Sequence, residues 1–357
     1  MLLRPLRLLA LRVSADARIA RMAYAVTSPG GPIGWLRARL RSVQPITWTV
    51  HRERVLGTSL ELQIRADGEV AARQAETVAL AEITRLEAVF SSFSETSELR
   101  RWQQTLGVPE RLSTELLEVL QAGERWRAHT EDAFHPGTEA LTRQWRLAAE
   151  RGKLPSEAEL QRLTAELTEP LWRVDMAGLT ATRLRDLPIN LNAIAKGYIV
   201  DRACERAVAQ PGVRQALLNL GGDLRVIGPE GVGVGIADPE HDADNAPPLA
   251  RIRLSNGAVA TSGGYRRGVR VGERWHSHLL DARTGWPAEH VASASVVAGN
   301  AMDADVLATA FSVLQLEESL ALAASLPGVA CLLVSQKGEV QRSSSWLDLE
   351  QSFGVSR

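Results

Sequence analysis

Cysteine is scarce in this chain of 357 residues, which has only Cys204 and Cys331, far apart and in apolar surroundings. Two such cysteines give no support for a disulfide framework, a CxxC redox pair or a zinc knuckle. Apolar runs are also short, and none reaches the roughly 18 residues that a transmembrane helix requires. The net charge is −1 at pH 7, so we do not expect a nucleic acid to be the main partner.

Lysine is rare too, because arginine supplies all of the 41 basic residues except Lys153, Lys196 and Lys337. Residues 1–44 carry eight arginines against one acid, Asp16, and begin like a basic leader that arginines interrupt. We expect residues 1–44 to form a disordered arm or leader, 45–345 one folded domain and 346–357 a C-terminal tail. The cellular compartment stays open.

The hydrophobic pattern between these ends predicts an α+β fold. Leu60, Leu62 and Ile64 alternate as in a strand, and Ala79 to Phe90 follow a helical stripe. Residues 132–180 are predicted to be mostly helical, with a capping box at Ser156 and Glu159. Further helices are predicted at 113–129, 193–209, 302–315 and 317–326, and strands at 214–227, 232–237, 250–254, 257–262, 268–280 and 291–299. Short turns join most strands, which favours a mixed, largely antiparallel sheet with packed helices and a helical lobe.

One candidate metal site lies in the segment NAMDADVLATAF, residues 300–311. Asp305 and Thr309 are four residues apart, so on a helix their oxygen atoms share one face. A carboxylate and a hydroxyl suit a hard cation such as Mg²⁺, which also binds phosphate and water. The structural alternative is that Asp303 and Asp305 complement the helix dipole while Thr309 bonds a backbone carbonyl. Spacing alone favours this alternative.

A candidate base lies in HSHLLDARTG, residues 276–285. His276 and His278 alternate, so on a strand they would point to one side. A histidine beside a carboxylate at a strand end can act as a general base for a hydroxyl nucleophile. The structural alternative is an ordinary turn at Asp281 with two partly exposed histidines.

A candidate phosphate site lies in NLNAIAKGYIVD, residues 190–201. Asn190 or Asn192 can cap the following helix, and the amide donors of that helix would face an anion. Lys196 near the helix start is unfavourable to the dipole unless something negative is bound. Alternatively, Lys196 simply extends from a surface helix into water.

Paired glycines end two predicted strands, in LNLGGD (218–223) and ATSGG (260–264). Glycine permits close approach of the backbone to a ligand, although it is equally common in bulges and hairpins. Neither segment fits GxGxxG or the P-loop, which argues against a Rossmann or Walker-type nucleotide site.

The order of the segments is more specific than any one of them. The chain contains, in sequence, VLGTSLEL (55–62), FSSFSETSEL (90–99), AFHPGTEALTRQW (133–145), NLNAIAKGYIVD (190–201), LLNLGGDLRVIG (217–228), VGIADP (234–239), ATSGGYRR (260–267), HLLDARTGWP (278–287) and ADVLATAF (304–311). Together these segments resemble the FAD:protein FMN transferases of ApbE type, over roughly residues 46–342.

The resemblance implies an ApbE-type α+β fold of the T-fold kind, with FAD in a cleft and Mg²⁺ between its pyrophosphate and the protein. It implies metal ligation by Asp305, Thr309 and the backbone carbonyl of Ala193. It further implies that Lys196 offsets phosphate charge and that His278 assists the acceptor hydroxyl. The implied FAD-contacting residues are Leu56, Phe93, Ala133, Phe134, His135, Asn190, Lys196 and Leu279.

The implied reaction moves FMN from FAD to a Thr or Ser hydroxyl of an acceptor flavoprotein, through a phosphoester bond and with release of AMP. Two alternatives stay open: a Mg²⁺-dependent FAD pyrophosphatase that gives FMN and AMP, and a non-catalytic flavin-binding protein. Four residues depart from the usual family pattern. The family usually has Asp at Asn190 and at His135, an aromatic hydroxyl at Phe93 and Pro at Ala282.

Overall fold

The computed structural model describes residues 44–241, 246–264 and 267–350. The arm expected at residues 1–44 lies outside these ranges except for Gln44. Residues 1–45 and 46–357 form separate units, and all that follows concerns the second.

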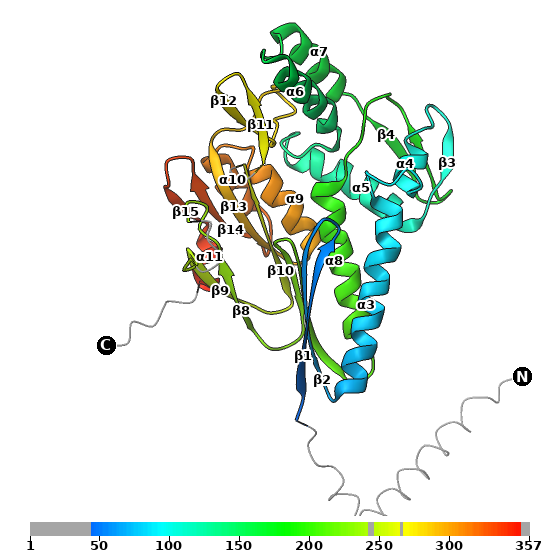
Figure 1. Cartoon of the computed structure of the whole chain (residues 1–357), viewed down its shortest axis with the longest axis vertical. Helices are drawn as coiled ribbons and strands as arrows, with labels where there is room; N and C mark the ends of the chain where they lie inside the picture. Colours follow the sequence, from blue (N-terminus) through cyan, green and yellow to red (C-terminus); the bar gives the residue numbers. More distant parts are fainter. Residues whose placement is uncertain (1–43, 242–245, 265–266, 351–357) are drawn as a thin grey trace, which may run out of the picture. The chain divides into compact units, whose positions relative to one another are not determined.

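The central element is an antiparallel sheet of eight strands, as the short turns predicted (Figure 1). Its strand order is β1-β2-β6-β7-β10-β13-β14-β15, and each neighbouring pair is antiparallel. The strands are β1 (Ile46–Val55), β2 (Thr58–Ala66), β6 (Val213–Leu220), β7 (Asp223–Ile227), β10 (Gly257–Gly263), β13 (Val291–Ala298), β14 (Ala330–Ser335) and β15 (Val340–Arg342).

The two faces of the sheet are covered differently, because successive residues of a strand point to opposite sides. Leu218 of β6 belongs to the main core, whereas its neighbour Leu217 belongs to a second cluster. The main core includes the apolar faces of α3 (Glu69–Phe90), α8 (Asn192–Val208), α9 (Ala301–Phe311) and α10 (Leu316–Ser325). The second cluster lies under the hairpin of β8 (Val232–Ile236) and β9 (Ala250–Leu254) and under α11 (Ser344–Leu349).

A largely helical lobe lies between α3 and α8 in the sequence (Figure 1). It contains α4 (Glu98–Trp102), α5 (Thr114–His129), η1 (Pro136–Thr138), α6 (Glu139–Arg151) and α7 (Glu157–Leu167), with strands β3 (Pro109–Arg111), β4 (Trp172–Asp175) and β5 (Thr180–Arg183). The predicted capping box of Ser156 and Glu159 is present at the start of α7. The prediction of mainly helix over 132–180 fails after Leu167. There Oδ1 of Asp175 accepts the N–H groups of Ala177 and Gly178 and turns the chain into a hairpin.

Two predicted strands are hairpins in the structure. Residues 214–227 fold back at Gly221 and Gly222, whose φ angles of 59° and 98° suit glycine best. Residues 268–280 fold back at Gly272 to give β11 (Gly268–Val271) and β12 (Arg274–Ser277).

Ordered packing continues past the expected domain boundary at residue 345. Trp346 of α11 is fully buried, and Arg342 forms an ion pair of 2.7 Å with Glu350. The segment expected as a C-terminal tail therefore begins inside a packed helix.

Candidate functional site

Helices α8 and α9 lie in direct contact because Gly197 has no side chain. A Cβ atom at this position would lie 2.3 Å from the carbonyl oxygen of Ala301, which is closer than packing permits. The contact brings the first two turns of α8, with Ala193 and Lys196, beside Asp305 of α9. Two segments that are distant in sequence thus form one site.

Two buried carboxylates share one ammonium group in this site. Nζ of Lys196 lies 3.1 Å from Oδ2 of Asp223, the first residue of β7, and is also close to Asp305. Both aspartates are buried, with exposed fractions of 1% and 6%. Oδ1 of Asp223 and Oδ2 of Asp305 have no hydrogen-bond partner among the described residues. One positive charge therefore faces two negative ones, and unpaired carboxylate oxygens of this kind suit a divalent cation.

The pKa values of Asp223, Asp305 and Lys196 are shifted by burial and by this unequal number of positive and negative groups. Burial raises the pKa of Asp223 well above its usual value, and repulsion from Asp305 raises it further. Burial also raises the pKa of Asp305, against the attraction of Lys196. The pKa of Lys196 rises because its attraction to the two carboxylates outweighs its own burial. The lysine therefore stays charged, and the site favours any cation that can replace a proton between the carboxylates.

The other predicted metal ligands lie on the same two helices. Thr309 is one turn beyond Asp305 on α9, and its hydroxyl makes no side-chain hydrogen bond within the described part of the chain. Asp303, by contrast, has the structural role considered from sequence. Its N–H donates to Oδ1 of the N-cap Asn300, and its carboxylate accepts Nε1–H of Trp126 at 2.7 Å. The structural interpretation thus applies to Asp303, and metal ligation by Asp305 stays a prediction.

Two strand turns approach the carboxylates. Leu56 and Gly57 connect β1 to β2 with φ angles of 50° and 78°, as in a tight hairpin turn. The N–H of Gly221, in the turn before Asp223, donates to the carbonyl of Ser59 at 3.1 Å. A Cβ at Gly221 would lie 2.5 Å from Oγ1 of Thr58, so glycine is needed for this approach. Leu56 is thereby placed on the turn next to the one that carries Asp223.

The segment with Ala133, Phe134 and His135 lies beside the start of α8. The N–H of Asn190 donates to the carbonyl of Pro136 at 2.8 Å, which joins the two segments. Oδ1 of Asn190 accepts the N–H of Asn192, so this residue turns the chain into the helix.

Both ring nitrogens of His135 have partners within the protein. Nδ1 accepts the N–H of Gly137 at 2.9 Å, and Nε2–H donates to the carbonyl of Leu167 at 3.0 Å. Burial lowers the pKa of His135 to about 4, so the ring is neutral near pH 7.

His278 and its neighbour His276 have different surroundings, so the prediction that both point to one side of a strand is wrong. Strand β12 ends at Ser277; His276 is buried against Trp145, and His278 is exposed. Nδ1 of His278 lies 3.1 Å from the carbonyl oxygen of Arg267. Since a carbonyl only accepts, Nδ1 carries the proton and Nε2 has a free lone pair.

The electrostatics of His278 suit a base. Partial loss of hydration at this exposed ring lowers its pKa below the usual histidine value, against the smaller raising effect of the hydrogen bond to the Arg267 carbonyl. The charge of Arg267 lowers the pKa of both His278 and Lys196, so the two predicted catalytic side chains share a neighbour.

The last two predicted FAD contacts differ in exposure. Phe93, on the loop after α3, is 88% exposed. Leu279 is buried beside His278, and its carbonyl accepts the N–H of Ala288. Sequence reasoning missed Asp223 and Arg267, although both lie in segments that it quoted. In LNLGGD the glycines were considered as a place where the backbone approaches a ligand, but the adjacent carboxylate of Asp223 was not considered as a site residue.

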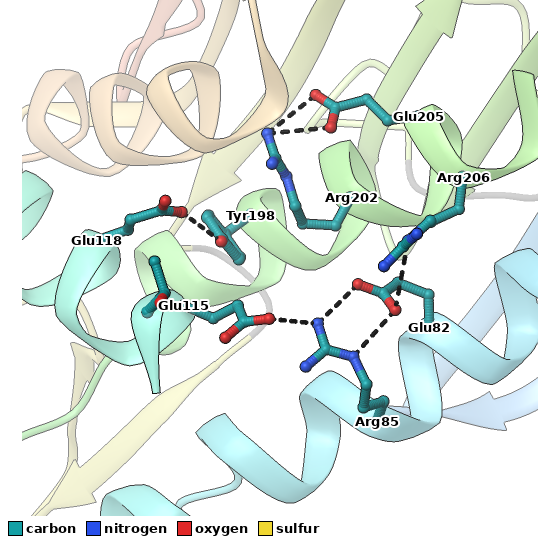
Figure 2. A pocket seen from close by; sticks show the side chains of 9 residues that line it. Glu82, Arg85, Glu115, Glu118, Tyr198, Arg202, Glu205 and Arg206 are labelled. Atoms are coloured by element: carbon teal, nitrogen blue, oxygen red, sulfur yellow. Dashed lines mark hydrogen bonds and ion pairs between the residues drawn. The ribbon is translucent and has the colours of Figure 1, made fainter. Parts of the chain in front are cut away.

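Two surface pockets lie along another face of α8. One, of about 320 Å³, is bordered by Arg85, Glu115, Tyr198, Arg202 and other charged residues (Figure 2). Figure 2 shows that these charges are paired with one another, for example Arg85 with Glu115 at 2.6 Å. The second pocket, of about 350 Å³, lies nearer the start of α9. Neither is lined by Lys196 or Asp305, and on a helix Lys196 points away from Tyr198 and Arg202.

The described residues lack two further features. No helix there is long and apolar enough to cross a membrane. No group of three or more His, Cys, Asp and Glu side chains there could hold a metal ion. A cation at Asp305 would therefore use mixed oxygen donors, such as carboxylate, hydroxyl and backbone carbonyl, which is the set that Mg²⁺ accepts.

Comparison with known proteins shows the family to which the chain belongs. The FAD:protein FMN transferase of Treponema pallidum is 29% identical over 343 residues, which cover 87% of this chain and 90% of that protein. The enzyme of the same name from Vibrio cholerae is 30% identical over 65% of this chain and 71% of its own length. The crystal structure of the ApbE protein of Thermotoga maritima superposes with a TM-score of 0.75, at 26% identity, over 86% of this chain and 100% of that one. A model of the ApbE family matches residues 56–333, and the chain therefore belongs to the ApbE family.

Proposed function

We propose that this chain is a FAD:protein FMN transferase that uses FAD as substrate and Mg²⁺ as cofactor. The acceptor is a Thr or Ser hydroxyl of a flavoprotein, and the products are a phosphoester-linked FMN and AMP. The observation that carries the proposal is the buried pair Asp223 and Asp305, which shares one lysine and has oxygen atoms without partners. The named function of the relatives supports the same activity.

Asp305, Thr309 and the carbonyl of Ala193 would hold Mg²⁺, and Asp223 adds negative charge beside them. When bound, Mg²⁺ supplies charge neutralisation for the pyrophosphate of FAD. Lys196 keeps its proton and has three N–H donors, so it can bind phosphate oxygen while paired with Asp223. Exposed Phe93 offers a flat apolar face to the flavin ring.

The transfer step exchanges one P–O bond for another. The acceptor hydroxyl oxygen attacks the phosphorus on the FMN side of FAD, and the bond from that phosphorus to the oxygen of AMP breaks. The hydroxyl proton goes to Nε2 of His278, whose Nδ1–H is fixed by the Arg267 carbonyl. Lys196 offsets the negative charge that collects on the phosphate oxygens.

The test combines the purified chain with FAD, Mg²⁺ and candidate acceptors, followed by denaturing-gel fluorescence and mass measurement for an added FMN. Asp305→Ala should abolish labelling. Asp303→Asn, which changes a carboxylate two residues away that accepts hydrogen bonds from the side chains of Asn300 and Trp126, should retain it. Labelling that is equal in wild type and Asp305→Ala would exclude the proposal.

A parallel incubation without acceptor tests the pyrophosphatase alternative. Release of FMN and AMP at a rate unaffected by acceptor would favour hydrolysis. Release of AMP in step with protein labelling would favour transfer. A chain that binds FAD and gives neither product would be a flavin-binding protein only.

A further inference from the structure

The start of α9 is capped by a carboxylate from another helix. Asp201 of α8 is buried, and its two oxygens accept the N–H groups of Ala301 and Met302 at 2.8 and 2.9 Å. These are the first two residues of α9. The local N-cap Asn300 accepts only the N–H of Asp303, so Asp201 completes the cap from a position 100 residues away.

An arginine holds the same junction from the sheet. Nε of Arg225, on β7, lies 3.4 Å from Oδ1 of Asp201, and its Nη1 donates to the carbonyl of Gly299. Arg225 therefore fixes both the capping carboxylate and the chain that enters α9. Burying this ion pair costs desolvation free energy, and the helix already has an Asn N-cap, so capping alone does not account for the pair. Together, Asp201 and Arg225 fix the position of the start of α9 relative to α8 and β7.

The contacts of Asp201 and Arg225 with the start of α9 lie next to the candidate metal site on both α8 and α9. Asp201 is one turn beyond Gly197 on α8. Gly197 is the residue at which α8 closely approaches Ala301. Asp305 is one turn beyond Ala301 on α9, on the other side of the same junction. A slide or rotation of α9 would move Asp305 and Thr309 together relative to Ala193 and Lys196.

We propose that Asp201 is a positioning residue for the metal site, which sets the distance between the ligands on α9 and those on α8 without touching the cation. The inference rests on the proposed function, because it presumes Mg²⁺ at Asp305. Residues that orient ligands from outside the coordination sphere typically change metal affinity by about 10- to 100-fold when altered. Asp201→Asn should therefore weaken Mg²⁺ binding by at least tenfold.

The experiment measures Mg²⁺ binding directly, by calorimetric titration of Mg²⁺ into each protein saturated with FAD and free of acceptor. Asp201→Asn keeps the size of the side chain but leaves one backbone N–H without an acceptor. Burial raises the pKa of Asp201 to about 6, so a neutral side chain is tolerated here and the variant should fold. FAD affinity without Mg²⁺ should stay within about twofold of wild type, since Asp201 is buried and is not one of the predicted FAD-contacting residues.

Asp303→Asn is the matched control, since Asp303 lies in the first turn of the same helix but its carboxylate accepts from Trp126 of α5 and from Asn300 instead of holding α9 to α8. It should lower the melting temperature and leave Mg²⁺ affinity within twofold. If Asp201→Asn is too unstable to titrate, Arg225→Gln decides instead. A loss of Mg²⁺ affinity of threefold or more in that variant supports the inference, and no loss overturns it.

The possible failures are distinguishable. Wild-type Mg²⁺ affinity in Asp201→Asn, with binding lost in Asp305→Ala, overturns the positioning role and leaves the proposed function intact. Equal losses of Mg²⁺ affinity in Asp201→Asn and Asp303→Asn also overturn it, because the effect would then be general destabilisation of α9. Absence of Mg²⁺ binding in the wild type overturns both.

Discussion

Nζ of Lys196 and Oδ2 of Asp223 lie 3.1 Å apart, and this ammonium also faces Asp305. When both carboxylates are ionised, Lys196, Asp223 and Asp305 together carry one net negative charge, and the repulsion between the carboxylates helps to raise the pKa of Asp223. Buried charges without compensation destabilise a folded protein. The repulsion between the two carboxylates therefore costs stability, and we expect a bound cation to reduce that cost. This is the pattern of a binding site, since an arrangement that only stabilised the fold would pair each charge.

Asp223→Asn should weaken Mg²⁺ binding and slow FMN transfer, each by about 10- to 100-fold. The same change removes repulsion between Asp223 and Asp305, so without Mg²⁺ the free energy of unfolding should stay equal or rise. Metal titration and urea unfolding of one preparation measure both effects. A variant with lower stability and unchanged Mg²⁺ affinity would mean that Asp223 is only a structural partner of Lys196.

FMN transfer should increase with pH through the pKa of His278. Its pKa lies below the usual histidine value, so the neutral base dominates at pH 7 and is lost as pH falls. We expect kcat/KM to reach a plateau near neutrality and to decline in acid. His278→Asn should be slower and lack that acid limb, whereas His276→Asn should keep it. An unchanged profile in His278→Asn would assign the base to another group.

Phe93→Ala should weaken FAD binding by about 3- to 10-fold, the usual worth of one aromatic stacking contact. Because Phe93 is 88% exposed, its removal should not change the melting temperature. Phe93→Tyr restores the phenol that the family usually has and should bind FAD at least as well as wild type. Flavin fluorescence quenching measures each affinity, and equal values for Ala and wild type would remove Phe93 from the site.

His135 should make the protein less stable in mild acid. Its pKa is about 4 in the folded protein and near 6.5 unfolded, so the unfolded chain binds more protons between these values. Stability therefore falls as pH drops from 6.5 to 4, by up to roughly 3 kcal/mol. Unfolding of wild type and His135→Gln across this range measures the difference. Parallel pH dependences in the two proteins would contradict the assignment.

The elements with strong periodicity were predictable from sequence. Helices α5, α8 and α9 and strands β8, β9 and β10 lie within a few residues of their predicted ranges, because their apolar residues recur at helix or strand spacing. Helix α3 contains the predicted stripe from Ala79 to Phe90 but begins earlier, at Glu69. Residues 214–227 were predicted as one strand because apolar residues continue on both sides of the turn at Gly221. The hairpin at Gly272 was missed although its second strand, Arg274–Ser277, is mostly polar. Trp346 lay in a segment assigned to the tail, and only its tertiary contacts reveal its burial.

The site was predictable only in part, for a related reason. Asp305 and Thr309 are four residues apart on one helix, so local geometry brings them together. Asp223 interacts with Asp305, 82 residues away, and Asp201 accepts the N–H of Ala301, 100 residues away. No rule based on local spacing predicts contacts at such separations. Nor could sequence show that Arg267 fixes the tautomer of His278, because its contribution is a backbone carbonyl.

The arrangement of β2 and β6 has a consequence for how the protein tolerates change. These strands are adjacent in the sheet, yet the helical lobe between α3 and α8 separates them in sequence. At the far end the connection closes locally, with the N–H of Asp67 bonded to the carbonyl of Gly212 at 2.7 Å. Closing a long flexible insertion instead of one ten times shorter costs only about 2 kcal/mol in chain entropy. Loops of the lobe that lie outside its core and its predicted FAD contacts can therefore vary in length at little cost to the sheet.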